Sequence, residues 1–149
     1  MEQHRALQVP PLALASLVRW GLYGIKPGGA LMCAVENDLI GFCSSADQVV
    51  LYSARDLMRY VFWNLPVQCF GSRDVCRNWS AKIRGDRSIL QHWDPFDHLE
   101  DQLVTKVLSL LGDDAVNDIL ALTGPETQSR IERLKPPPNS QTQVEPSEC

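Results

Sequence analysis

The 149-residue sequence lacks several features that would place it in a specialised class. No apolar run approaches the roughly 18–20 residues that a membrane-spanning helix needs, and even residues 9–18 are interrupted by Pro10, Pro11 and Ser16. The first residues show no small-residue cleavage pattern, so we expect neither a membrane span nor a secretory signal. The five cysteines form no C-x-x-C pair and no zinc-ligand spacing, which favours reduced thiols in a cytoplasmic protein.

The composition is that of a folded protein with an uneven charge distribution. Hydrophobic residues make up 44% of the chain and charged residues 21%, which excludes a chain that is disordered over its whole length. Residues 1–92 hold ten Lys and Arg against seven Asp and Glu, a net charge of +3. Residues 93–149 hold four against eleven, a net charge of −7. This asymmetry indicates either two surfaces with different partners or two ordinary solvated faces.

Apolar residues recur every three or four positions along most of the chain, and glycine, proline or polar residues separate these segments. The pattern predicts an all-α protein with helices over 12–23, 30–42, 46–64, 73–83, 96–111, 113–122 and 125–134. We divide it into a compact multi-helix module over residues 1–88, an acidic helical extension over 89–134 and a disordered C-terminal tail over 135–149.

Acidic and histidine residues cluster after residue 92. If a helix begins at Phe96, four of them share one helix face, close enough for several to reach one divalent ion. These candidate metal ligands are Asp94, Asp97, His98 and Asp101. The same residues also have the pattern of a helix start, with Asp94 as the N-cap and Pro95 in the first turn. We favour capping over metal binding and expect no cofactor.

The most basic stretch of the chain surrounds one tryptophan. Arginine beside an aromatic residue can bind phosphate and stack on bases. The candidate nucleic-acid-binding residues are therefore Arg73, Arg77, Trp79, Lys82 and Arg84. An ordinary solvated helix face is the simpler interpretation, because Asp74 and Asp86 lie nearby and the chain as a whole is acidic.

Aromatic residues at expected helix ends are the candidate partner-binding residues, because Trp and Tyr are enriched at binding hot spots as well as in cores. They are Trp63, Phe70 and Trp93. Carboxylates of the acidic extension would bind a basic groove on a partner, and these are Asp97, Glu100, Asp101, Asp113, Asp114 and Asp118. No serine, cysteine or carboxylate pair has the neighbours that catalysis needs, so the sequence predicts no enzyme.

Residues 14–80 contain a series of short motifs, each present once. They read G-I-K-P-G-G-A-L at 24–31, A-V-E-N-D-L at 34–39, A-D at 46–47, N-L-P at 64–66 and F-G-S at 70–72, followed by Trp79. This order resembles a family of small uncharacterised proteins of tailed bacteriophages and prophages, which typically read G-I-x-P-G-G-F-L, A-V-x-x-N-D-L, R-A-D, Y-N-x-x-P and W-G-S. The chain departs from that pattern at Ala30, Ser45, Trp63 and Phe70.

The resemblance implies a small helical phage accessory protein and supplies no catalytic residue. Together with the aromatic helix ends, it leads to the hypothesis of a non-enzymatic protein in the cytoplasm of a bacterial host. There it would bind and modulate or inhibit a host or antiviral-defence component, as anti-CRISPR-like inhibitors do. The alternatives are a nucleic-acid-binding regulator using residues 73–87 and a metal-dependent enzyme at 94–101. A homodimer stays open, and no membrane partner is expected.

Overall fold

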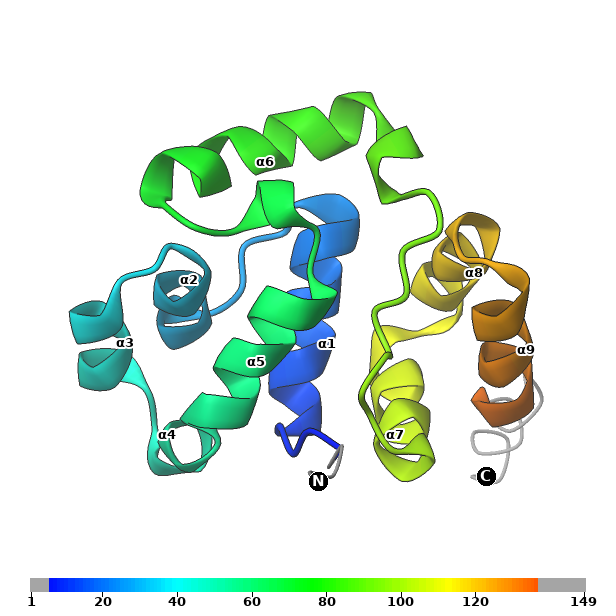
Figure 1. Ribbon diagram of the computed structural model, residues 1–149, viewed down its shortest axis with the longest axis horizontal. Helices are drawn as coiled ribbons and strands as arrows, with labels where there is room; N and C mark the ends of the chain where they lie inside the picture. Colours follow the sequence, from blue (N-terminus) through cyan, green and yellow to red (C-terminus); the bar gives the residue numbers. More distant parts are fainter. Residues whose placement is uncertain (1–5, 137–149) are drawn as a thin grey trace, which may run out of the picture.

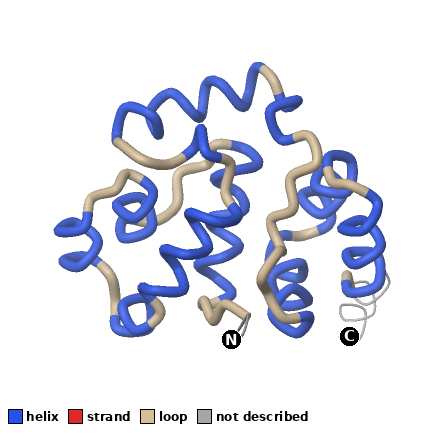
Figure 2. The backbone as a smooth tube through the Cα atoms, viewed as in Figure 1, coloured by secondary structure: helices blue, strands red, loops and turns tan. Residues whose placement is uncertain are grey.

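The computed structural model describes residues 6–136, which form an all-α fold as the sequence predicts (Figure 1, Figure 2). Its α-helices are α1 (Pro11–Tyr23), α2 (Gly29–Val35), α3 (Leu39–Ser45), α4 (Gln48–Tyr52), α5 (Ala54–Asn64), α6 (Arg73–Gly85), α7 (Asp101–Leu111), α8 (Asp113–Leu122) and α9 (Pro125–Leu134). Two short 3-10 helices are η1 (Val67–Cys69) and η2 (Arg87–Leu90). The predicted disordered tail lies outside the described residues from residue 137 onward. Between residues 6 and 136, no helix has the length and apolar character needed to cross a membrane.

The single helix predicted over 30–42 is wrong, because α2 and α3 are separated by a turn. Asn37 has a φ of 64°, a left-handed conformation that asparagine adopts more readily than most residues but that a right-handed helix cannot contain. Asp38 then caps α3, where its carboxylate accepts a hydrogen bond of 2.9 Å from the N–H of Gly41. The low helix propensity of this Asn-Asp pair therefore marks a helix boundary.

The helix predicted over 46–64 is likewise divided into α4 and α5, at Ser53. The Ser53 hydroxyl donates to the carbonyl of Val49 at 3.2 Å and to that of Val50 at 3.1 Å. These carbonyls belong to the last turn of α4, where backbone acceptors lack partners in the helix. Asp47 begins α4 by accepting a hydrogen bond from the N–H of Val50 at 2.9 Å.

One buried cluster holds the described helices together, and its largest members include Trp20, Trp79, Tyr60, Phe42 and Phe96. The Trp79 indole N–H donates to the carbonyl of Trp20 at 2.9 Å, which ties α6 to α1. Figure 1 shows α1 between α5 and α7, and α1 packs directly on α7. Residues on both sides of position 88 therefore share one core. The division into a module and an extension stays a prediction.

Several residues of the short motifs over 24–72 determine where helices begin and end. Gly24 closes α1 with a φ of 70°, and a Cβ at this position would lie 2.7 Å from the Cα of Ser80. Asp38, Asp47 and Ser72 each accept a hydrogen bond from the backbone at the start of a helix. These motifs therefore specify local geometry rather than the chemistry of a site.

Candidate functional site

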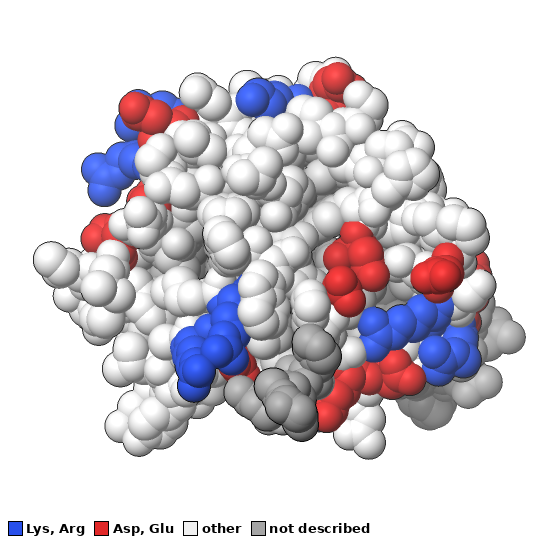
Figure 3. Space-filling view, viewed as in Figure 1, with Lys and Arg blue, Asp and Glu red and all other residues white. Residues whose placement is uncertain are grey.

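Several large apolar side chains are exposed to solvent around the C-terminal end of α5. Phe62 is 72% exposed, Trp63 49% and Val67 73%, and the partly buried Phe70 lies beside them. The Phe62 and Phe70 rings make an edge contact with centroids 6.4 Å apart. We call these four residues the aromatic surface. Figure 3 shows few charges over η1 and the adjoining end of α5, and such apolar patches commonly mark interaction sites.

The helical period of α5 explains why this surface faces outward. Leu57, Tyr60 and Val61 are buried and occupy the inner face of the helix. Position 62 then falls on the opposite side and position 63 on the flank of the helix, because successive residues are about 100° apart around the helix axis. Phe62 and Trp63 are exposed because the inner face is already occupied.

Two polar neighbours hold the Trp63 ring in place. The Arg59 guanidinium lies 5.7 Å from the ring centroid, and the His98 ring lies 4.9 Å away at an angle of 46°. Contacts of this kind restrict the rotamers of an exposed side chain, which lowers the entropy cost of ordering it when a partner binds. An aromatic side chain with an apolar neighbour and polar residues around it has the arrangement of a binding hot spot.

Not every predicted partner-binding aromatic lies on this surface. Trp63 and Phe70 do, but the Trp93 ring packs against α1 at Gly21. It lies so close that a Cβ added to Gly21 would be 2.8 Å from the ring. The Trp93 indole N–H donates to the carbonyl of Asn64 at 2.6 Å. The sequence prediction also missed Phe62 and Val67. The position of Phe62 opposite the buried face of α5 was the available signal.

The acidic residues of the extension differ in whether their carboxylates are engaged within the chain. Asp118 accepts a hydrogen bond from the Tyr23 hydroxyl and lies 3.8 Å from the Arg87 guanidinium. Burial, assisted by Asp118, raises the pKa of Tyr23 to about 12. Over α7 and α9, Figure 3 shows Lys and Arg lying among Asp and Glu. The exposed acidic residues of the set are Asp97, Glu100, Asp101, Asp113 and Asp114.

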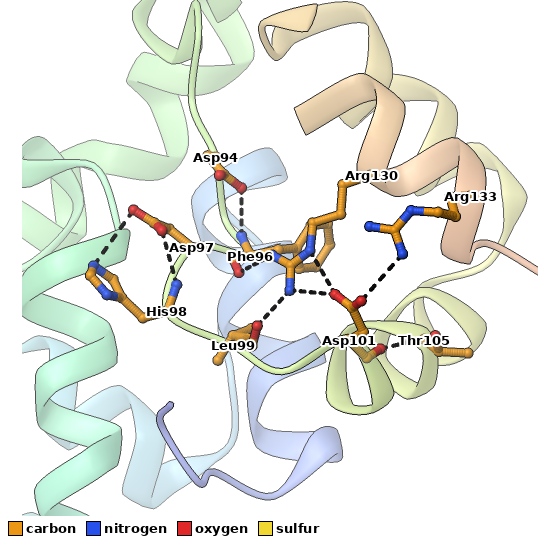
Figure 4. Close-up of polar contacts among 9 residues, drawn as sticks. All are labelled: Asp94, Phe96, Asp97, His98, Leu99, Asp101, Thr105, Arg130 and Arg133. Carbon is orange, nitrogen blue, oxygen red and sulfur yellow. Dashed lines mark hydrogen bonds and ion pairs between the residues drawn. The ribbon is translucent and has the colours of Figure 1, made fainter. Parts of the chain in front are cut away.

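Arg130 of α9 organises the loop that precedes α7 (Figure 4). Its guanidinium donates to the carbonyls of Phe96 and Leu99 and lies 2.9 Å from the carboxylate of Asp101. His98 has a φ of 68°, which a helix cannot contain. The helix predicted over 96–111 therefore begins only at Asp101. The carbonyls of the irregular loop before it accept hydrogen bonds from Arg130 of the distant helix α9 instead of from a helix backbone.

The four candidate metal ligands consequently do not share a helix face, so the alternative of a metal site there lacks its geometric basis. The favoured interpretation of Asp94 as a helix N-cap is wrong as well, because α7 begins only at Asp101. Asp94 accepts a hydrogen bond from the N–H two residues later and caps no helix. Asp97 lies 3.5 Å from the His98 ring, whereas hydrogen bonds from Arg130 and its neighbour Arg133 lower the pKa of Asp101, on the other side of the loop (Figure 4). Within residues 6–136, no three His, Cys, Asp or Glu side chains are arranged to hold a metal ion.

Replacing Arg130 with methionine should lower the free energy of unfolding by about 1–3 kcal/mol, because the carbonyls of Phe96 and Leu99 lose a charged donor. Urea unfolding followed by circular dichroism measures this change. Arg133→Met is the matched control: Arg133 is 61% exposed and pairs only with Asp101 among the described residues, so its loss should stay below about 1 kcal/mol. Equal losses in the two variants would contradict the role assigned to Arg130.

The predicted nucleic-acid-binding residues are only partly brought together. Arg73, Arg77 and Arg84 line a groove between α6 and the segment that contains Lys26 and α2. Trp79 does not line it, because its side chain is fully buried beneath α6. The alternative in which Trp79 stacks on bases is therefore wrong, because a fully buried ring cannot reach a base. Lys82 is exposed on α6 but lies outside the groove.

The fold and these surfaces describe an all-α protein with an exposed aromatic surface and a separate basic groove. Comparison of the chain with protein-family models, with curated proteins and with solved structures finds no match. A functional assignment therefore depends on the residues of this chain itself.

Proposed function

We propose that this protein is a non-enzymatic phage or prophage accessory protein that binds a host or antiviral-defence protein through the aromatic surface, in the cytoplasm of a bacterial host. The observation that carries the proposal is the exposure of Phe62, Trp63 and Val67 at and just beyond the C-terminal end of α5. Fully burying one such side chain is worth about 1.5–3 kcal/mol. Covering the three together therefore contributes several kcal/mol toward association with another protein, to be set against the cost of lost translational and rotational freedom.

The surroundings of the aromatic surface favour a protein partner over a small ligand. The Phe62 side chain on the outer face of α5 and the Trp63 side chain on its flank are exposed to solvent rather than enclosed in a cavity. Arg59 and His98 contact the Trp63 ring, and Asp97 is paired with His98. An apolar centre with charged residues at its edge is the common design of protein–protein interfaces.

The acidic extension has a secondary role in this proposal. Asp118 already faces Arg87, and Asp101 faces Arg130 and Arg133. A basic partner would have to displace these cations before it bound the carboxylates. Asp97 lies next to the aromatic surface and is the acidic residue best placed to steer a basic partner toward it.

Affinity capture from a phage-sensitive bacterial host tests this proposal with single substitutions on the surface. Phe62→Ser is expected to reduce recovery of the captured partner at least about 10-fold, because a buried aromatic anchor carries a large share of binding energy. Tyr52→Ser is the matched control, since Tyr52 is 83% exposed on α4 and lies outside the aromatic surface. Its recovery should match that of the native protein.

Two outcomes would overturn the proposal. One is equal recovery of every captured protein with Phe62→Ser and Tyr52→Ser. The other is a homodimer that sedimentation shows to dissociate on Phe62→Ser, because the aromatic surface would then be occupied by a second copy of this chain.

A further inference from the structure

The basic groove presents a regular row of cations along one side of α6. Arg73, Arg77, Ser80 and Arg84 are spaced by four, three and four residues and line the groove together, as helix periodicity requires. The adjacent face of α6, about 100° around the helix axis, is anchored in the core by Cys76, Trp79 and Ile83. The rotation of the helix about its axis is therefore set by buried side chains, and the arginine row cannot turn away from the groove.

The facing wall comes from the loop after α1 and from α2. The Ser80 hydroxyl donates to the carbonyl of Gly24 at 2.8 Å, which brings this loop against α6. Lys26 lies on the loop, and Glu36 at the end of α2 is the only acidic residue that lines the groove. Figure 1 shows α6 along the edge of the molecule, beyond α2. The groove thus has four cationic side chains and one anionic side chain.

These cations are available to an external anion. Lys26 and Arg84 form no ion pair among the described residues. Arg73 lies 3.7 Å from Glu36 and Arg77 lies 3.4 Å from Asp74, but both arginine side chains are 68% exposed. Exposed pairs of this kind contribute about 0–1 kcal/mol and exchange readily for other anions.

We propose that this groove binds the phosphodiester backbone of nucleic acid without sequence preference. Three of the four cations are arginines, whose planar guanidinium pairs with two phosphate oxygens at once. The groove contains no aromatic side chain, because Trp79 is buried behind α6. Ile25 and Met32 are the groove's larger apolar lining residues. Protein interfaces are most often anchored by Trp and Tyr together with Arg, whereas backbone recognition of nucleic acid requires only a row of cations. The site is distinct from the aromatic surface and does not depend on its function.

Fluorescence anisotropy with a labelled duplex and a labelled single strand, each of about 20 nucleotides per strand, tests this inference. Four neutralised phosphates predict a slope of log K against log salt near −4 for the duplex and near −3 for the single strand. The double variant Lys26→Gln and Arg84→Gln should lose at least about 10-fold in affinity at low salt. Its slope of log K against log salt for the duplex should become shallower by about 2, from near −4 to near −2.

The matched control is the double variant Arg55→Gln and Lys106→Gln. Both residues are exposed, lie outside the groove and carry the same total charge as the pair removed from it. This control should bind within about 2-fold of the native protein. Absence of binding by the native protein at low salt would overturn the inference. Equal losses in the two double variants, or equal binding of polyglutamate, would also overturn it by revealing attraction to charge alone. Circular dichroism of all variants confirms that the fold is retained.

Discussion

Replacing Trp79 with alanine is expected to lower the free energy of unfolding by about 3–5 kcal/mol. The Trp79 side chain is fully buried, and its indole N–H donates to the carbonyl of Trp20. The substitution leaves a cavity between α6 and α1, because the surrounding helices collapse only partly around a missing aromatic ring. It also removes the hydrogen bond that links these helices. Urea unfolding monitored by circular dichroism gives the change directly.

Trp63→Ala is the control for the Trp79 prediction, because it removes the same side chain from an exposed position. The Trp63 side chain is 49% exposed. Its ring contacts in the described part of the chain are with Arg59 and His98, which lie at the surface. Its loss should cost about 1 kcal/mol or less. A similar loss of stability in both variants would contradict the assignment of Trp79 to the core and Trp63 to the binding surface.

Replacing Gly24 with alanine is expected to lower the free energy of unfolding by about 2–4 kcal/mol. Gly24 has a φ of 70°, and a left-handed conformation alone costs a residue with a Cβ about 1–2 kcal/mol. The added Cβ would also lie 2.7 Å from the Cα of Ser80 and 3.2 Å from a methyl group of Ile83. Backbone atoms must move to relieve this clash, so α6 is expected to shift away from α1.

Gly29→Ala in the same segment separates the clash from the general effect of losing a glycine. A Cβ at Gly29 meets no atom within 4 Å, and the residue lies in the first turn of α2, where alanine is favoured over glycine. We expect a change within about 1 kcal/mol, in the stabilising direction. Thermal and urea unfolding of both variants measures the difference. Equal behaviour of the two variants would refute the close approach of the loop to α6.

The positions of most helices could be predicted from the sequence, but three of their boundaries could not. Apolar periodicity continues through the Asn37 turn, through Ser53 and through residues 96–100. At the first two positions, local side-chain hydrogen bonds interrupt the helix. At residues 96–100 the cause is Arg130, which lies more than 30 residues away in the chain. No pattern within the loop itself reports that interaction.

The sequence also could not separate exposed aromatic residues from buried ones. Trp63 and Phe70 lie on the aromatic surface. Trp93, a candidate partner-binding residue, and Trp79, a candidate only in the nucleic-acid-binding alternative, both pack against α1. An aromatic side chain has the same sequence signature in a core and at an interface. Phe62 was missed because its exposure is decided by which face of α5 the core takes up.

The sequence by itself determined the all-α class, the start of α6 after its capping residue Ser72, and the uneven distribution of charge. Those properties depend on interactions within about four residues, which periodicity and capping patterns report directly. The tertiary structure alone decided which aromatic residues face solvent and that Lys26 joins the arginines of α6 in one groove. Burial and convergence depend on contacts between residues far apart in the chain, and local patterns carry no record of those contacts.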